Sequence, residues 1–161
     1  MSDIVLLDTS IYLNVLNVPG RNQQREEVFR DFELRVQNKD HFLLPMVTIW
    51  ETGNHISRLS TGALRRQYAC QLAQSVSDAL QGQAPFSPTY FPNRETFLQW
   101  IDAFPNFSKS NKSPKKTTEG ISLSDLSIIK EWEQTCARHP MSRVLIWSLD
   151  KDLSSYNQGA R

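Results

Sequence analysis

Two short apolar runs, one near each end of the chain, constrain the fold more than any other feature of the sequence. Ile4 to Leu7 is continuously apolar and lies between two aspartates, and Val144 to Trp147 is a second such run. A short, uninterrupted apolar run is typical of a strand that is buried on both faces, as in a parallel sheet. The sequence therefore predicts buried parallel strands near both ends of the chain.

Helical patterns fill most of the chain between these strands. A third short strand is predicted at Phe42 to Leu44. Helices are predicted at Ser10 to Asn17, Arg25 to Lys39, Pro45 to near Gly62, Ala63 to Leu80, Glu95 to Phe104 and Ser122 to His139. Strands separated by helices indicate an α/β fold with a central parallel sheet flanked by helices.

A long segment around residues 82–120 interrupts this pattern. Its first part contains three prolines, which predict an irregular connection (Pro85, Pro88 and Pro92). Residues 105–118 hold four lysines and no acidic residue, which predicts a basic, mobile loop. We therefore expect a single domain over residues 1–161 with an irregular insertion around 82–120.

Composition narrows the class of protein. A chain of 161 residues with 39% hydrophobic and 22% charged residues suits one folded domain. No stretch approaches the roughly 20 apolar residues of a membrane span, and the N-terminus lacks the basic residues of a secretory signal, so we expect a cytoplasmic protein. Two cysteines and three histidines exclude a disulfide scaffold and a structural zinc site. With a net charge of +1, any attraction to phosphate must be local.

Four acidic residues are expected at one edge of the predicted sheet. Asp8 and Asp150 follow the apolar strands. Asp125 lies in the first turn of a helix, and Glu51 lies within about two turns of a helix start. Strand C-termini and helix N-termini share the edge at which open α/β sheets bind ligands. Clustered carboxylates repel one another unless a cation compensates, and Mg²⁺ or Mn²⁺ prefers such oxygen ligands.

Each aspartate also has an ordinary structural interpretation. Asp8 could cap a helix, Asp125 could complete a capping box, and Asp150 could belong to a turn. Glu51 is different, because it adjoins apolar residues such as Trp50, and a glutamate beside a buried face needs a partner. Both interpretations stay open for each aspartate taken singly, but the four residues together favour a site.

Other site chemistries lack their motifs. The sequence contains no phosphate-binding loop of the NTPases and no dinucleotide-binding glycine pattern after the first strand. Phosphatases with an aspartyl nucleophile usually carry Asp-x-Asp at this point, where Ser10 replaces the second aspartate. The Gly-x-Ser-x-Gly motif of serine hydrolases is also absent.

The acidic residues lie in four motifs that extend over nearly the whole chain. These are Leu6-Leu7-Asp8-Thr9-Ser10, Glu51, Ile121-Ser122-Leu123-Ser124-Asp125 and Ile146-Trp147-Ser148-Leu149-Asp150-Lys151-Asp152. Together they resemble the acidic motifs of the PIN-domain family, with Ser148 in place of a threonine. PIN domains are metal-dependent nucleases, mostly acting on RNA, and many small bacterial ones are toxins of toxin-antitoxin pairs. The resemblance implies a three-layer domain and an endoribonuclease that is the toxin of such a pair.

The resemblance also implies roles for the acidic residues. Asp8 would be the central ligand of Mg²⁺ or Mn²⁺, and Asp125 and Asp150 would complete the metal shell. Glu51 would position a second ion or the attacking water. Asp152 follows the same strand as Asp150 and is the alternative fourth ligand. Two hydroxyl groups would orient the carboxylates by hydrogen bonds (Ser10 and Ser148).

Substrate binding at an acidic site needs nearby cations. The candidates are Lys109, Lys112, Lys115, Lys116, Arg58, Arg65 and Arg66, with solvated surface charge as the alternative interpretation. The resemblance implies RNA as substrate and a small antitoxin protein as partner, and it leaves a homodimer open. Two other functions remain as alternatives: a catalytically silent PIN-like module that binds RNA or protein, and a phosphohydrolase that acts on small molecules.

Overall fold

The main sheet is largely parallel. The structure, a computed structural model, describes residues 2–158, so the predicted domain limits at residues 1 and 161 lie outside it. Within this range the main sheet has five strands in the order β3-β2-β1-β6-β7. Their bounds are β1 (Ile4–Leu7), β2 (His41–Leu44), β3 (Phe86–Pro88), β6 (Val144–Trp147) and β7 (Asn157–Gln158). The first four strands are parallel and β7 is antiparallel to β6, so the predicted α/β fold around a parallel sheet is confirmed.

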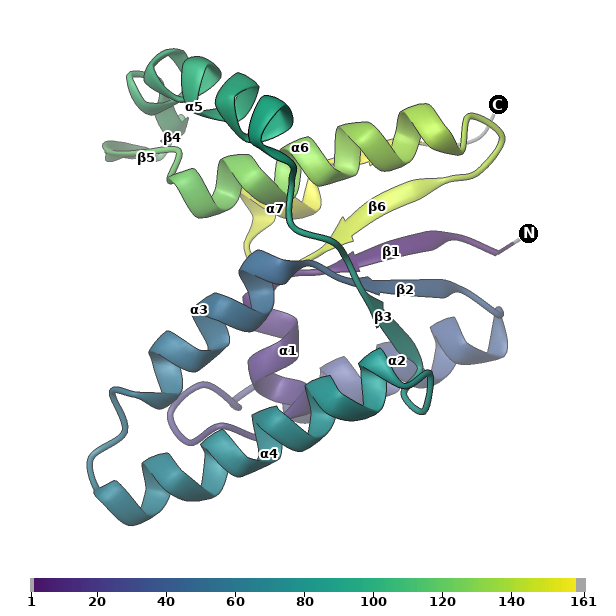
Figure 1. Cartoon of the computed structure of the whole chain (residues 1–161), viewed down its shortest axis with the longest axis vertical. Helices are drawn as coiled ribbons and strands as arrows, with labels where there is room; N and C mark the ends of the chain where they lie inside the picture. Colours follow the sequence, from purple (N-terminus) through teal and green to yellow (C-terminus); the bar gives the residue numbers. More distant parts are fainter. Residues whose placement is uncertain (1, 159–161) are drawn as a thin grey trace.

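Helices cover both faces of this sheet (Figure 1). Their bounds are α1 (Thr9–Val15), α2 (Arg25–Gln37), α3 (Met46–Ile56), α4 (Gly62–Leu80), α5 (Arg94–Ser108), α6 (Leu123–Arg138) and α7 (Lys151–Ser154). In Figure 1, α1, α2 and α4 lie on one side of the sheet, and α5 and α6 lie on the other. None of the helices between residues 2 and 158 is long and apolar enough to cross a membrane.

Alternate side chains of β1 enter two separate apolar clusters. Val5 and Leu7 belong to the larger cluster, which α1, α2 and α4 cover. Ile4 and Leu6 belong to a second cluster with side chains of α6. Because successive side chains of a strand point to opposite faces, this alternation produces the three layers that the resemblance implies.

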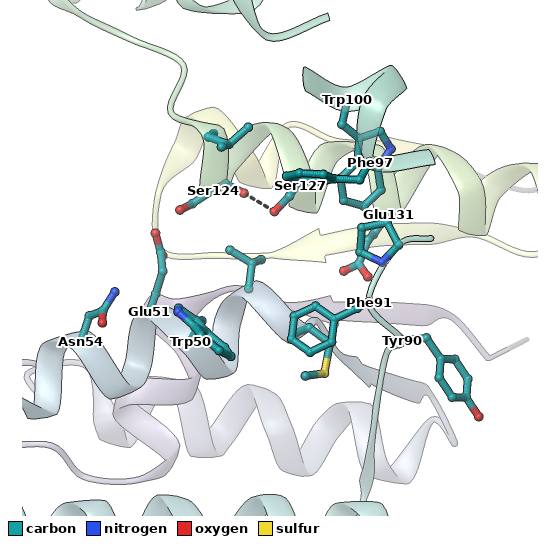
Figure 2. Close-up of a pocket in the computed structure, with 14 residues that line it drawn as sticks. Trp50, Glu51, Asn54, Tyr90, Phe91, Phe97, Trp100, Ser124, Ser127 and Glu131 are labelled. Carbon is teal, nitrogen blue, oxygen red and sulfur yellow. Dashed lines mark hydrogen bonds between the residues drawn. The ribbon is translucent and has the colours of Figure 1, made fainter. Parts of the chain in front are cut away.

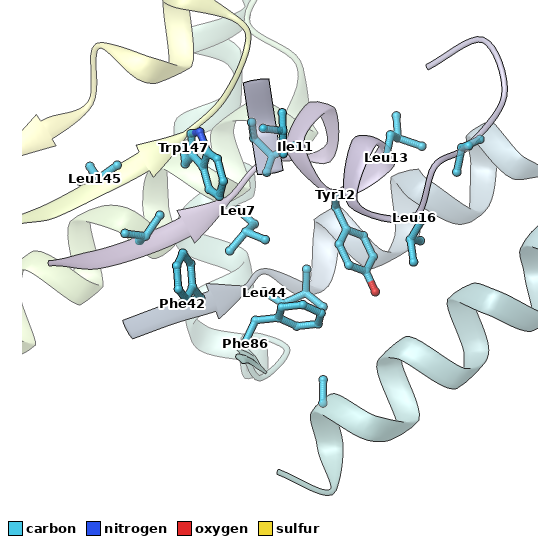
Figure 3. Close-up of a cluster of buried hydrophobic side chains, with 14 of the residues drawn as sticks. Leu7, Ile11, Tyr12, Leu13, Leu16, Phe42, Leu44, Phe86, Leu145 and Trp147 are labelled. Atoms are coloured by element: carbon cyan, nitrogen blue, oxygen red, sulfur yellow. The ribbon is translucent and has the colours of Figure 1, made fainter. Parts of the chain in front are cut away.

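The larger cluster fixes the start of α1 against the sheet (Figure 3). Tyr12 is fully buried there, and its ring lies edge-on to Phe86 with centroids 5.7 Å apart. The phenol group donates a hydrogen bond of 2.7 Å to the hydroxyl of Ser75 on α4, so its polar atom is satisfied inside the core. These contacts hold the helix that begins directly after Asp8.

The structure differs from the irregular insertion predicted around residues 82–120. β3 pairs with β2 although it ends at Pro88, which is tolerated because β3 is an edge strand. α5 continues past its predicted end at Phe104 and contains Pro105. The basic segment forms an antiparallel hairpin of β4 (Asn111–Ser113) and β5 (Lys116–Gly120) instead of a loop. No strand was predicted at β7, which pairs with β6.

Candidate functional site

The register of β1 and β6 determines which residues meet at the edge of the sheet. Leu7 lies opposite Trp147, and the backbone N–H of Asp8 donates to the carbonyl of Trp147 at 3.0 Å. Asp8 and Ser148 are therefore neighbours although 140 residues separate them in the chain. The strand order extends from β1 in both directions here, toward β2 and toward β6, and such a point is where open α/β sheets bind ligands.

The carboxylate of Asp8 is held by two serine hydroxyl groups. Its Oδ2 accepts hydrogen bonds from Ser148 at 2.7 Å and from Ser10 at 3.0 Å. The Ser10 hydroxyl in turn accepts from the N–H of Leu149 at 3.0 Å. Asp8 stands at the cap position of α1, but its side chain makes no capping hydrogen bond. The ordinary interpretation of Asp8 as a helix cap therefore does not apply.

Two threonine hydroxyls place Glu51 beside the start of α1. Thr48 is fully buried on α3 and donates to the carbonyl of Leu7 at 2.8 Å. One turn later on the same helix, Glu51 Oε2 accepts a hydrogen bond of 2.9 Å from Thr9. Neither threonine was assigned a role from the sequence, although Thr9 lies in the Asp-Thr-Ser motif. Trp50, expected beside a buried face, is instead 63% exposed.

Asp125 and Asp150 share one lysine. The N–H of Asp125 donates to the hydroxyl of Ser122 at 3.0 Å, which confirms the predicted N-cap of α6. The Asp125 carboxylate pairs with the Lys112 ammonium at 3.3 Å, and Asp150 lies 3.4 Å from the same nitrogen. An ammonium group of the hairpin therefore lies between these two acids.

Both aspartates that follow β6 face the hairpin. Asp150 Oδ1 accepts from the N–H of Asp152 at 3.0 Å, so Asp150 caps α7, whereas its ordinary interpretation was a turn residue. The Lys116 ammonium lies 3.6 Å from Asp150 and 3.2 Å from Asp152. The two acids thus share a cation, and neither distance singles one of them out as the fourth ligand.

Burial and neighbouring charges shift the pKa values of Asp125 and Asp150 in opposite directions. Burial raises the pKa of Asp125, and the charges of Asp8 and Glu51 raise it further against the opposing effect of Lys112. Burial also opposes ionisation of Asp150, but the backbone N–H that it caps and the nearby lysines hold its pKa below the ordinary value. The raised pKa of Asp125 therefore comes mainly from burial, with a smaller contribution from the negative charges of Asp8 and Glu51.

The donor set fits a hard divalent cation in its chemistry, because it consists of carboxylate oxygens. Asp125 and Asp150 already have a cation between them, the Lys112 ammonium. Over the described range, no three His, Cys, Asp or Glu side chains converge closely enough to hold a metal ion. The edge of the sheet thus carries an internal cation where the sequence predicted a metal.

The remaining basic candidates lie outside this cluster. Lys109 at the end of α5, Lys115 in the turn of the hairpin and Arg58 after α3 are exposed. Arg65 lies on α4, where its side chain donates to a backbone carbonyl. The hairpin itself is fitted closely against α5, since a side chain at Gly120 would collide with a backbone carbonyl of that helix.

A cavity of about 430 Å³ opens beside Glu51 (Figure 2). Its walls come from α3, the connection after β3, α5 and the first turns of α6. Five aromatic side chains of the described residues belong to the lining: Trp50, Tyr90, Phe91, Phe97 and Trp100. The cavity is not evident from the sequence, because it depends on the connection after β3, which crosses the edge of the sheet to reach α5 (Figure 1).

Glu131 is a buried carboxyl group in the wall of this cavity. It is 9% exposed, and its Oε2 has no hydrogen-bond partner within residues 2–158. Burial raises its pKa from 4.5 to about 7, although a hydrogen bond with Thr89 and the charge of Arg138 act in the opposite direction. Glu131 was not singled out from the sequence, where it is one more glutamate on an amphipathic helix.

The raised pKa of Glu131 makes the stability of the protein depend on pH. Between pH 4.5 and 7 the native state holds a proton that the unfolded state has lost, so the free energy of unfolding should fall as pH rises. The loss attributable to this group is about 3 kcal/mol at most. Urea unfolding at pH 5 and pH 8 should show a smaller loss for Glu131→Gln than for the wild type. The exposed Glu33→Gln variant is the control, and an equal loss in all three proteins would contradict the prediction.

Comparison with known proteins is informative at the level of the fold. No protein-family model matches the chain, and no curated protein sequence matches it. The solved structure of FitAcB from Neisseria gonorrhoeae is similar, with a TM-score of 0.55 and 18% identity over 94% of this chain and 91% of that one. That likeness includes the central parallel sheet flanked by helices. The chain therefore has the PIN-domain fold that its acidic motifs led us to expect.

Proposed function

We propose that the protein is a divalent-metal-dependent endoribonuclease that hydrolyses phosphodiester bonds in RNA. The observation that carries this proposal is a chain of contacts at the switch point of the sheet: the Ser148 hydroxyl links Asp8 to Asp150, and the Lys112 ammonium links Asp150 to Asp125. Asp8, Asp125 and Asp150 would hold Mg²⁺ or Mn²⁺. The PIN-domain fold supports the same proposal, because the resemblance to that family implies metal-dependent nuclease activity.

The chain's own residues would prepare the site for hydrolysis. A bound divalent ion supplies an activated water and neutralises charge on the phosphate. Ser10 and Ser148 hold Asp8 in one orientation, so its carboxylate does not have to be ordered when the ion binds. Thr9 holds Glu51, which would orient the attacking water. Lys112 would leave the acids and become available to the phosphate backbone of the substrate.

The biological setting is part of the same proposal. We place the protein in the cytoplasm as the toxin of a toxin-antitoxin pair, with a small antitoxin protein as partner and a homodimer left open. The alternatives make different predictions. A silent PIN-like module would bind RNA without cleaving it, and a small-molecule phosphohydrolase would cleave nucleotides and leave RNA intact.

Cleavage of RNA should require both the divalent ion and Asp8. The purified protein should cut a mixed RNA pool in Mn²⁺ or Mg²⁺ and leave it intact in EDTA. Asp8→Asn should reduce the rate by about a hundredfold or more, because it weakens charge stabilisation worth several kcal/mol. Asp31→Asn, an exposed change on α2, should cut like the wild type. Undiminished cutting in EDTA or by Asp8→Asn would refute the metal mechanism.

The two aspartates after β6 should differ in their effect on cleavage. We assign the ligand role to Asp150, which lies nearer the strand and contacts Lys112. Asp150→Asn should therefore remove most of the cleavage, and Asp152→Asn should cost less. Rates of both variants should be compared at equal folded fraction, measured by circular dichroism, because Asp150 also caps α7. A larger loss of cleavage in Asp152→Asn than in Asp150→Asn would instead assign the ligand role to Asp152.

Lys112 should compete with metal for Asp125 and Asp150. Lys112→Met removes the ammonium that pairs with Asp125 and one of the two that pair with Asp150, so its melting temperature in EDTA should be lower than that of the wild type. Added Mn²⁺ should then raise the melting temperature more in this variant, and a tenfold gain in affinity corresponds to about 1.4 kcal/mol. Lys115→Met, in the exposed turn of the hairpin, is the matched control. Equal stabilisation of all three proteins by Mn²⁺ would exclude competition.

A further inference from the structure

The aromatic cavity beside Glu51 combines two features of a ligand site. Its ring-bearing walls stay open to solvent although they are apolar: Trp50 is 63% exposed, Phe91 61% and Phe97 47%. Trp50 and Phe91 meet edge to face, with centroids 6.0 Å apart and ring planes at 81°, so they form a corner with two ring faces. The volume of about 430 Å³ lies within the range of small-molecule sites, roughly 300 to 1,000 Å³.

A polar group without a partner points into this cavity. Glu131 descends from α6 between the aromatic side chains, and Figure 2 shows its carboxyl group directed into the space above Phe91. Its Oε2 is buried without a hydrogen bond in the described part of the chain. A buried polar atom without a partner costs about 1–3 kcal/mol, which a ligand with a hydrogen-bonding edge would recover.

The charge of the lining argues against a phosphate inside the cavity. Its charged side chains are Glu51 and Glu131, and the described lining contains no lysine or arginine. A flat, uncharged ring with hydrogen-bonding groups on its edge suits such walls. It would stack on an aromatic face and present its edge to Glu131.

One acidic residue, Glu51, connects the cavity with the other acids of the sheet edge. Glu51 lines the cavity and, through Thr9, lies next to the start of α1, where Asp8 is found. A nucleotide whose phosphate lies at the acids would therefore have its base within reach of the cavity. Single-stranded RNA is commonly recognised in this way, by bases splayed onto aromatic side chains.

We propose that this cavity binds one unpaired base of a single-stranded RNA, stacked against Trp50 and Phe91 and hydrogen-bonded at its edge by Glu131. This inference rests on the proposed function, since it places the phosphate next to that base at the acidic cluster. It adds to that function an aromatic stacking site for a base and a base-reading side chain, neither of which the acidic motifs contain.

Binding without cleavage tests the proposal. The probe is a fluorescently labelled six-nucleotide single-stranded RNA in EDTA, with affinity measured by anisotropy. Trp50→Ala and Phe91→Ala should each weaken binding by about tenfold, because stacking of one base on an aromatic ring is typically worth that much or more. Leu80→Ala is the matched control, since Leu80 is 70% exposed at the far end of α4, outside the cavity. Trp50→Phe should retain most of the affinity because it keeps an aromatic face.

An abasic probe identifies what the aromatic side chains contact. On a six-nucleotide backbone without bases, the wild type and both alanine variants should bind equally, and the salt dependence should be the same for all, because no phosphate contact is lost. Glu131→Gln should change the order of affinities among six-nucleotide homopolymers of A, C and U. Alanine variants that bind the intact RNA like the wild type would overturn the proposal and leave the cavity to a protein partner. A loss that persists on the abasic probe would overturn it too.

These outcomes are separate from those of the proposed function. Base-dependent binding in EDTA without cleavage in Mn²⁺ would support the base site and refute the nuclease. Cleavage in Mn²⁺ with no effect of the aromatic variants on binding would support the nuclease and refute the base site.

Discussion

The pairing of β1 with β6 is the contact on which the rest of the site depends. Leu7 lies opposite Trp147, so the residues that follow the two strands, Asp8 and Ser148, come within hydrogen-bond distance across the whole length of the sequence. A shift of one residue in this register would turn every side chain of the strand to the other face. It would bury acids in the apolar layers and separate Asp8 from its serine. Both strands are buried on both faces, so the packing of the core fixes their register. The same register fixes the positions of the acids that follow the strands.

Electrostatic repulsion among the acidic side chains is the second constraint, and the protein offsets it in two ways. Two serine hydroxyls donate to Asp8 and one threonine hydroxyl donates to Glu51, so both carboxylates have hydrogen-bond partners within the chain. Asp125 and Asp150 instead share the ammonium of Lys112, which the hairpin carries to them from outside the main sheet. The pKa of Asp125 is still raised, mainly by burial and to a smaller extent by the charges of Asp8 and Glu51, so Lys112 compensates only in part. A divalent cation, with twice the charge of the Lys112 ammonium, would neutralise these carboxylates more fully.

The fold and the position of the acids were predictable because they follow from short-range patterns. Apolar runs define β1 and β6, and a strand followed by an aspartate places that aspartate at the edge of a parallel sheet. The segment from β3 to β5 was not predictable in the same way. Its prolines predict breaks, but a proline at the end of an edge strand leaves the ladder intact. The backbones of β4 and β5 pair with each other in a separate two-stranded sheet. Lys112 was selected as a cation, yet its contact with the acids depends on that hairpin. Glu131 gave no signal at all, because its burial comes from α5 and the connection that crosses the sheet edge.

The internal ammonium has a consequence for how the protein would be made in a cell. A site whose acids depended on a metal ion for neutralisation would tie folding of the chain to the supply of that ion. Here the chain supplies its own positive charge beside Asp125 and Asp150, so we expect folding not to depend on a metal ion. On the proposed function, scarcity of Mg²⁺ or Mn²⁺ would then leave the amount of folded protein unchanged and lower only the fraction that is competent to cut. Metal supply would set a threshold for cleavage, independent of synthesis and turnover.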